Sequence, residues 1–332
     1  MNHYVAIDNV CAWPNLTMLP DGTLTATIFN QPCHGQWEGD VECWASEDGG
    51  LFWQHRGTPA AHEPTNNRMN VATGLAANGD LIVLASGWSN RKPPGERTSF
   101  GDSEILPIRV CRSSDGGTTW THEGELDLDV NGPPIPFGDI LPAEDGTLQA
   151  AVYVVTGRSP LTPSPCLLTS DDHGKTWARK SMIVDDGNHD ETTTLHVEGP
   201  RWLAAARTTD HTSLDLFISE DHGRTWTFSQ MLTGPQMAPA HLLRLADGRI
   251  LLTYGVRHRG CYGIGYRLSD DDGQTWSRFP RMLVNFGPAT DGGYPSSVQR
   301  DDGQIVTAWY AKATTFHHRY HMGVTHWQPD DA

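Results

Sequence analysis

The chain has 332 residues and a formal net charge of −16 at pH 7. This acidic balance, without clustered Lys or Arg, excludes an ordinary nucleic-acid partner, because phosphate binding needs a basic patch. No apolar run approaches the roughly 18 residues that a membrane-spanning helix requires, so we expect no membrane partner.

The beginning of the chain lacks the basic and long apolar regions of a secretory signal, which favours a cytoplasmic protein. The first predicted element is a strand at about residues 4–7. The six cysteines are scattered along the chain without CxxC or any other zinc-ligand spacing. We therefore expect no metal site.

One motif, Ser-x-Asp-x-Gly-x-Thr-Trp, recurs at intervals of about 50–70 residues, which is the range of propeller blades. Its five copies begin at Ser46, Ser113, Ser170, Ser219 and Ser269. The Asp is suited to accept backbone N–H bonds in a turn, the Gly supplies a positive φ, and the Trp buries a large ring. These copies predict outer turns of an all-β fold.

Hairpin turns alternate with these motifs along the chain. They lie at Asp21-Gly22, Asn78-Gly79, Asp145-Gly146, Glu198-Gly199, Asp247-Gly248 and Asp302-Gly303. Two hairpins make one four-stranded antiparallel blade, so the pattern predicts a six-bladed β-propeller that occupies residues 1–332 as a single domain. The last blade ends at residues 322–327 without an Asp motif, and the N-terminal strand is expected to complete it and close the ring.

The repeated motif resembles the Asp box, or BNR repeat, of the sialidase superfamily, and the resemblance covers essentially the whole chain. In that superfamily an arginine triad binds the substrate carboxylate at the centre of the ring. A tyrosine assisted by a glutamate is the nucleophile, and an aspartate is the acid/base. The resemblance implies a glycoside hydrolase that needs no cofactor and acts on a carbohydrate.

Four positions match the superfamily pattern. The resemblance makes Glu191 the tyrosine-assisting glutamate and Arg207 a triad arginine. Glu191 lies in the segment Asn188-His189-Asp190-Glu191-Thr192-Thr193, and a hairpin and a strand that ends in Arg207 follow this segment. Gly292-Gly293-Tyr294-Pro295-Ser296-Ser297 resembles the nucleophile segment, which makes Tyr294 the nucleophile. Arg257 and Arg259 both precede the fifth Asp box, and Arg257 is preferred as a triad member because it directly ends its strand.

The first blade departs from the superfamily. Sialidases begin with Arg-Ile-Pro, whereas this chain reads Ala12-Trp13-Pro14, so the first triad arginine is replaced by Ala12. Where the acid/base aspartate is expected, residues 31–40 offer His34, Glu38 and Asp40 instead. An altered triad implies that the protein is not a standard sialidase.

Several further polar residues are candidates for the substrate site. His241 begins an inner strand before a hairpin, and Arg68 and Asn70 occupy the matching place in the second blade. Trp88 and Arg91 follow on the loop of that blade. We assign His241 and Arg68 to substrate binding, together with Glu38, Arg207 and Arg257.

The leading functional hypothesis is a retaining glycoside hydrolase that removes a terminal, acidic sugar. Tyr294 attacks with Glu191 as its base, the two arginines Arg207 and Arg257 hold the carboxylate, and His34 or Asp40 protonates the leaving group. A second hypothesis makes His34 the acid/base of a hydrolase or lyase acting on a uronic-acid-containing linkage. A third is a non-catalytic glycan-binding propeller.

Overall fold

The computed structural model describes residues 1–96, 102–158, 160–287, 291–315 and 317–329. Within these ranges the regular elements are twenty-four β-strands, with no α-helix. No helix long and apolar enough to cross a membrane is therefore found in the described part of the chain. The prediction of an all-β fold is confirmed.

The strands form four four-stranded sheets and one eight-stranded sheet. The eight-stranded sheet joins two antiparallel four-strand units edge to edge, so the described strands fall into six such units. Unit 1 contains β2 (Asn15–Met18), β3 (Leu24–Phe29), β4 (Val41–Ser46) and β5 (Gln54–Ala60). Unit 2 contains β6 (Asn70–Leu75), β7 (Leu81–Ser86), β8 (Arg109–Ser113) and β9 (Thr121–Glu125). Unit 3 contains β10 (Pro134–Pro142), β11 (Leu148–Arg158), β12 (Leu161–Ser170) and β13 (Ala178–Met182).

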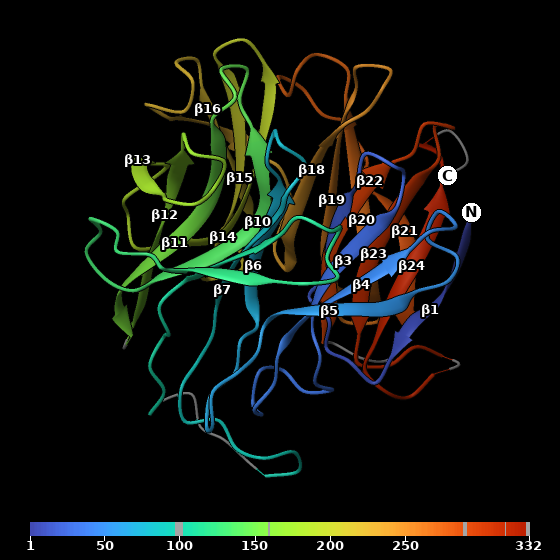
Figure 1. Ribbon diagram of the computed structural model, residues 1–332. Helices are drawn as coiled ribbons and strands as arrows, with labels where there is room; N and C mark the ends of the chain where they lie inside the picture. Colours follow the sequence, from blue (N-terminus) through green and yellow to red (C-terminus); the bar gives the residue numbers. More distant parts are fainter. Residues whose placement is uncertain (97–101, 159, 288–290, 316, 330–332) are drawn as a thin grey trace.

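The remaining three units follow the same order. Unit 4 contains β14 (His189–Glu198), β15 (Arg201–Thr208), β16 (Leu214–Ser219) and β17 (Thr227–Met231). Unit 5 contains β18 (Met237–Arg244), β19 (Ile250–His258), β20 (Cys261–Ser269) and β21 (Arg281–Gly287). Unit 6 contains β22 (Gly292–Gln299), β23 (Ile305–Ala311), β24 (His321–Trp327) and the N-terminal strand β1 (Asn2–Asp8). The pairing of β1 with β24 brings the two ends of the chain close together, as Figure 1 shows.

Units 2 and 3 share one sheet because their first strands approach each other closely. β6 and β10 pair in parallel, with Ala72 opposite Gly138 and Thr73 opposite Asp139. Gly74 permits this approach, since a Cβ at that position would lie 2.0 Å from the carbonyl oxygen of Ile140. The first strands of units 2 and 3 therefore lie side by side.

The Asp boxes lie between the third and fourth strands of units 1 to 5 and share one hydrogen-bond pattern. In the third box, Ser170 Oγ accepts from Gly174 N at 2.8 Å and donates to Asp172 Oδ1 at 2.8 Å. Asp172 Oδ1 also accepts from the amides of Lys175 and Thr176, at 3.0 Å and 2.9 Å. The same Ser–Asp and Gly–Ser bonds recur in the other four boxes. The aspartate therefore organises each turn, as the motif predicts.

Acid should weaken these turns. Hydrogen bonds from the hydroxyl and amide of Thr119 lower the pKa of Asp115 to about 2, and the carboxyl pKa is lowered in the other four boxes as well. A depressed carboxyl pKa contributes stability that is present above the unfolded pKa and is lost as the pH falls through the folded pKa. We expect the free energy of unfolding to fall between about pH 4 and pH 2.

Urea unfolding followed at several pH values across this interval measures the effect. Asp115→Asn, which keeps one acceptor oxygen without the titrating charge, should show a shallower pH dependence than the wild-type protein. An unchanged slope in Asp115→Asn would contradict the assignment of this stability to the box aspartates.

Candidate functional site

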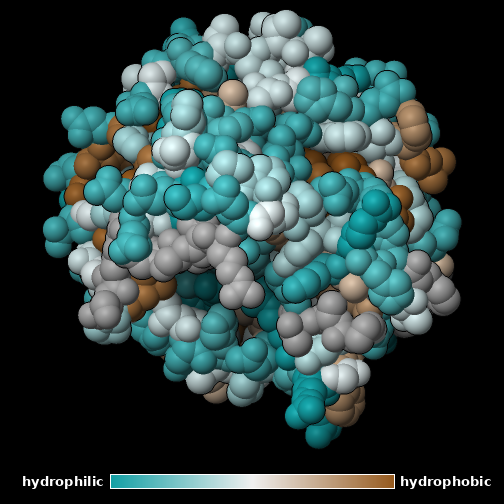
Figure 2. All heavy atoms as spheres, turned by 90° about the horizontal axis from the view of Figure 1, so that it is seen from below, coloured by the Kyte–Doolittle hydropathy of each residue, from teal (hydrophilic) through white to brown (hydrophobic). Residues whose placement is uncertain are grey.

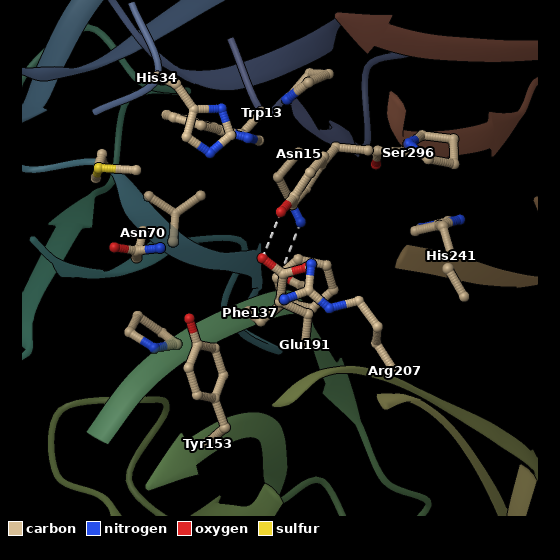
Figure 3. Close-up of a pocket in the computed structure, with 18 of the residues that line it drawn as sticks. Trp13, Asn15, His34, Asn70, Phe137, Tyr153, Glu191, Arg207, His241 and Ser296 are labelled. Atoms are coloured by element: carbon tan, nitrogen blue, oxygen red, sulfur yellow. Dashed lines mark hydrogen bonds and ion pairs between the residues drawn. The ribbon is translucent and has the colours of Figure 1, made fainter. Parts of the chain in front are cut away.

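The first strands of the six units surround a cavity of about 490 Å³. Each strand contributes a polar or aromatic side chain to the lining, and these are Asn15 of β2, Asn70 of β6, Phe137 of β10, Glu191 of β14, His241 of β18 and Tyr294 of β22. Figure 3 labels all of these residues except Tyr294, and it shows Trp13 and His34 on one side of the cavity and Tyr153 on the other. Figure 2, which views the molecule from below, shows a largely hydrophilic face that is hollowed near its centre. Residues distant in sequence therefore meet in one cavity.

Tyr294 and Glu191 are joined directly across the cavity. Tyr294 Oη donates a hydrogen bond to Glu191 Oε1 at 2.6 Å, although the two residues lie 103 positions apart. Burial and the neighbouring Glu191 carboxylate raise the pKa of Tyr294, so its hydroxyl is protonated at neutral pH. Burial also raises the pKa of Glu191, partly offset by the Arg207 guanidinium. A base with a raised pKa is suited to accept the phenolic proton as the oxygen becomes a nucleophile.

The backbone holds Tyr294 in an unusual conformation. Its φ is 51°, in the left-handed region that a tyrosine rarely adopts. The ladder between β22 and β23 shifts its register between Gly293 and Ser296, which is a bulge that re-aims side chains. Such strain persists where the surroundings fix it, and it clusters at functional sites. Here it directs the hydroxyl toward Glu191.

Arg207 is bound by two acidic residues. Its Nε and Nη2 donate to Asp190 Oδ1 and Oδ2 at 2.8 Å and 2.6 Å, and its Nη1 lies 2.7 Å from Glu191 Oε2. Both carboxylates are nearly buried, with side chains 3% and 10% exposed. The guanidinium therefore neutralises and orients Glu191, and its charge is already balanced before a ligand enters.

The guanidinium of Arg257 helps to lower the pKa of Glu191, although the two residues form no ion pair. Its Nε donates to the carbonyl of Gly292 at 3.3 Å, and its Cζ lies 5.6 Å from the centre of the Tyr294 ring. Among the described residues no carboxylate lies within ion-pair distance of Arg257, although it lines the cavity. Burial and the two arginines lower the pKa of the neighbouring His211. This end of the cavity is electropositive and suited to an anion.

His34 is paired with an acid that the sequence did not single out. His34 Nδ1 lies 3.1 Å from Asp291 Oδ1, which also accepts from Tyr310 Oη at 2.6 Å. Asp291 Oδ2 accepts from Tyr320 Oη. Burial raises the pKa of Asp291, but the hydrogen bonds from His34 and the two tyrosines lower it well below the usual range. An ionised Asp291 fixes the imidazole with Nδ1–H toward the carboxylate, which leaves Nε2 for chemistry.

Aromatic rings line much of the remaining wall. Trp13 lies edge-on to His34, with ring centroids 4.9 Å apart, and 6.1 Å from the ring of Tyr294. Trp88, Phe137 and Tyr153 also border the cavity. A concave site with aromatic walls and a few convergent polar groups is the usual form of a small-ligand site.

The comparisons with known proteins agree with this fold. Residues 22–307 match the BNR repeat-like domain family. The chain belongs to this family, within the sialidase superfamily. A sialidase from Micromonospora viridifaciens is 24% identical over 298 residues, which cover 79% of this chain and 44% of that protein. The BNR-repeat chain therefore spans less than half the length of that relative.

Solved structures resemble the BNR-repeat chain along nearly its whole length. A protein of unknown function from Dyadobacter fermentans superposes with a TM-score of 0.83 at 23% identity, covering 98% of this chain and 97% of that one. A Trypanosoma rangeli sialidase in complex with the inhibitor DANA superposes with a TM-score of 0.70 at 15% identity, covering 96% and 55%. At these identities the likeness establishes the fold.

Six of the nine predicted site residues line the cavity of the BNR-repeat chain. They are Tyr294, Glu191, His34, Arg207, Arg257 and His241. Of the further candidates, Asn70 and Trp88 also line it. The buried Arg91 instead donates to the carbonyl of Gly35 at 3.0 Å and supports the loop that carries His34.

Asp40, Glu38 and Arg68 do not line the cavity, because each is engaged in local structure. Asp40 Oδ1 accepts from both the amide and the ring Nδ1 of His62, each at 2.7 Å. Glu38 Oε1 accepts from the amide of Thr65 at 2.5 Å.

Arg68 has only 2% of its side chain exposed and donates to Glu63 at 3.0 Å and to the carbonyl of Pro107 at 2.8 Å. It therefore cannot replace the missing triad arginine, and the assignment of Arg68 to substrate binding is corrected.

The first unit differs from the sequence expectation in one further respect. Ala12 is fully buried in the core around β3, whereas the adjacent Trp13 lines the cavity with a φ of 40°. An aromatic ring therefore borders the site beside the position where the superfamily has an arginine. Within the described residues, no cluster of His, Cys, Asp and Glu has the arrangement of a metal site.

Proposed function

We propose that this chain is a retaining glycoside hydrolase that removes a terminal acidic sugar, with its six four-strand units acting as the blades of a closed propeller. The observation that carries the proposal is the 2.6 Å hydrogen bond from Tyr294 Oη to Glu191 Oε1 beside Arg257, which has no ion-pair partner among the described residues. A tyrosine needs a neighbouring base to act as a nucleophile near neutral pH. The superfamily likeness supports the same reaction class.

In the first chemical step, Tyr294 Oη attacks the anomeric carbon while its proton passes to Glu191. The bond to the leaving oxygen breaks, and that oxygen takes the Nε2 proton of the His34 imidazolium. A glycosyl–tyrosine intermediate results. Water then attacks the anomeric carbon, His34 accepts the proton of that water, and Tyr294 regains its proton from Glu191.

Arg257 is proposed as the principal anchor for the substrate carboxylate. A planar guanidinium forms charge-assisted bonds to a carboxylate, which Arg257 has available because no acid is paired with it among the described residues. Arg207 is proposed to orient Glu191 and to help balance its charge, because both of its bonded edges already face Asp190 and Glu191. This division of roles refines the expectation that both arginines hold the carboxylate.

A panel of aryl glycosides that includes uronides, sialosides and rhamnosides tests the proposal. We expect turnover of at least one acidic glycoside. The kcat/KM for α-sialosides should be at least about tenfold lower than for that glycoside, because the missing charged contact costs roughly 1.5–3 kcal/mol. Efficient cleavage of a sialyl-aryl substrate would contradict the altered-triad argument. Tight binding of an acidic glycoside without cleavage between about pH 4 and pH 9 would favour the glycan-binding propeller.

The contact between His34 and Asp291 favours a second candidate function. In this alternative, His34 Nε2 is the acid/base of a hydrolase or lyase that acts on a uronic-acid-containing linkage, and Tyr294 only supports the ligand. The hydrogen bond of Asp291 to His34 and the exposure of nearly half of the His34 side chain support it. An unsaturated uronic-acid product would favour the lyase, and a reducing sugar without a new double bond would favour hydrolysis.

A further inference from the structure

Three units are linked through one carboxylate beside the cavity. Asp139 of β10 accepts a hydrogen bond from Asn15 Nδ2 of β2 at 3.0 Å through Oδ1. Its Oδ2 lies 2.9 Å from His241 Nε2 of β18. Asn15 Nδ2 also donates to the carbonyl of Gly138 at 2.7 Å. We call Asn15, Asp139 and His241 the cross-unit triad.

Two polar atoms of this triad have no hydrogen-bond partner within the described part of the chain. They are Asn15 Oδ1 and His241 Nδ1. Asn15 and His241 are only 5% and 4% exposed, yet both line the cavity. A buried polar atom that stays unsatisfied costs about 1–3 kcal/mol. A ligand group that donates a hydrogen bond to either atom from the cavity side would remove this cost.

The bonds already made determine what such a group must be. Both protons of Asn15 Nδ2 are used, so Asn15 offers the lone pairs of Oδ1. Asp139 is an acceptor, which places the proton of a neutral His241 on Nε2 and leaves a lone pair on Nδ1. The triad therefore presents two acceptors, and their natural partners are hydroxyl groups.

We propose that the cross-unit triad is a hydroxyl-binding subsite that selects the ring of an acidic monosaccharide, while Arg257 binds the carboxylate of the same ligand. This inference rests on the proposed function for the position of the sugar in the cavity. It adds a specificity determinant that the arginines do not supply, because a guanidinium recognises any carboxylate. The ligand class is a polyhydroxylated monosaccharide acid with one carboxylate.

Two variants of His241 distinguish a hydroxyl-binding role of the triad from a purely structural role. In H241Q the amide nitrogen takes the place of Nε2, so the bond to Asp139 is kept and the acceptor at Nδ1 is lost. In H241N the amide oxygen takes the place of Nδ1, so the acceptor is kept and the bond to Asp139 is lost. H241Q should therefore weaken ligand binding, whereas H241N should lower thermal stability.

The experiment measures Kd by calorimetry for wild type, H241Q and H241N with D-glucuronic acid, N-acetylneuraminic acid and benzoate. Benzoate carries a carboxylate without hydroxyls. We expect H241Q to weaken binding of at least one acidic sugar by about five- to tenfold, the effect of one hydrogen bond. H241N should stay within about twofold of wild type, and benzoate should bind all three proteins equally. The melting temperature should fall further in H241N.

Three results would overturn the subsite. The first is sugar affinity that follows the melting temperature, with H241N the weaker binder. The second is equal sugar affinity in all three proteins, and the third is a wild-type protein that binds neither sugar. The aryl-glycoside panel is read separately. Turnover with unchanged affinity in H241Q removes only this inference, whereas weakened binding in H241Q without turnover removes only the hydrolase.

Discussion

Tyr294→Phe is expected to lower kcat by roughly 10³–10⁴-fold while KM stays within about twofold. The substitution removes the one oxygen that attacks the anomeric carbon, and it keeps the ring that packs against Trp13 and Arg257. A group that acts only in the transition state affects kcat, whereas a group that holds substrate affects KM. Steady-state kinetics on the best aryl glycoside of the panel measures both constants.

Tyr254→Phe is the matched control for this change. Tyr254 is fully buried, its hydroxyl has no partner among the described residues, and it does not line the cavity. Its loss should leave kcat within about twofold of the wild-type value. If Tyr294→Phe retains activity and His34→Ala is inactive, the histidine mechanism replaces the tyrosine mechanism. Loss of activity in both variants fits the proposed step, in which Tyr294 and His34 have separate roles.

The all-β fold and its turns could be predicted from the repeats, because each repeat contains the residues that form its own turn. An Asp box contains within a few residues the acceptor, the hydroxyl and the glycine that its turn requires, as Ser170 and Asp172 show. The parallel contact between β6 and β10 had no comparable signal. Only Gly74, inside an apolar strand pattern, marked a close backbone approach, and one glycine does not identify the neighbouring strand.

The candidate site was predictable where a residue type matched a superfamily position, as with Glu191 and Tyr294. Its supporting acids were not, because their partners lie in other units. Asp291 is 257 residues from His34, and Asp139 is 102 residues from His241. Asp40 and Glu38 were selected as acid/base candidates because they are acidic residues in the expected segment. In the structure their carboxylates accept hydrogen bonds from His62 and from the amide of Thr65, in the segment that follows unit 1.

Arg207→Met is expected to lower the free energy of unfolding by about 3–5 kcal/mol near neutral pH, because it leaves two nearly buried carboxylates without their partner. Arg257→Met should have a smaller effect on stability and mainly raise KM, because Arg257 has no ion-pair partner among the described residues and acts on Glu191 only by helping to lower its pKa. Urea unfolding and steady-state kinetics of the two variants separate the structural arginine from the substrate anchor.

The pH dependence of Arg207→Met provides the sharper test of this division. The Arg207 guanidinium lowers the pKa of Glu191, whose burial raises it, so removing the arginine must raise that pKa further. Glu191 has to be ionised to accept the proton of Tyr294. The acid limb of kcat/KM should therefore move to higher pH in Arg207→Met. When the pKa of a folded carboxyl is raised, the stability of the protein falls as the pH rises above the unfolded pKa of that carboxyl. Arg207→Met should therefore be less destabilised at about pH 5 than at about pH 7.

Adding Asp190→Asn to Arg207→Met should restore part of the lost stability, because it removes one of the two unpaired charges. A variant with an unshifted acid limb and a raised KM alone would instead assign Arg207 to the substrate carboxylate.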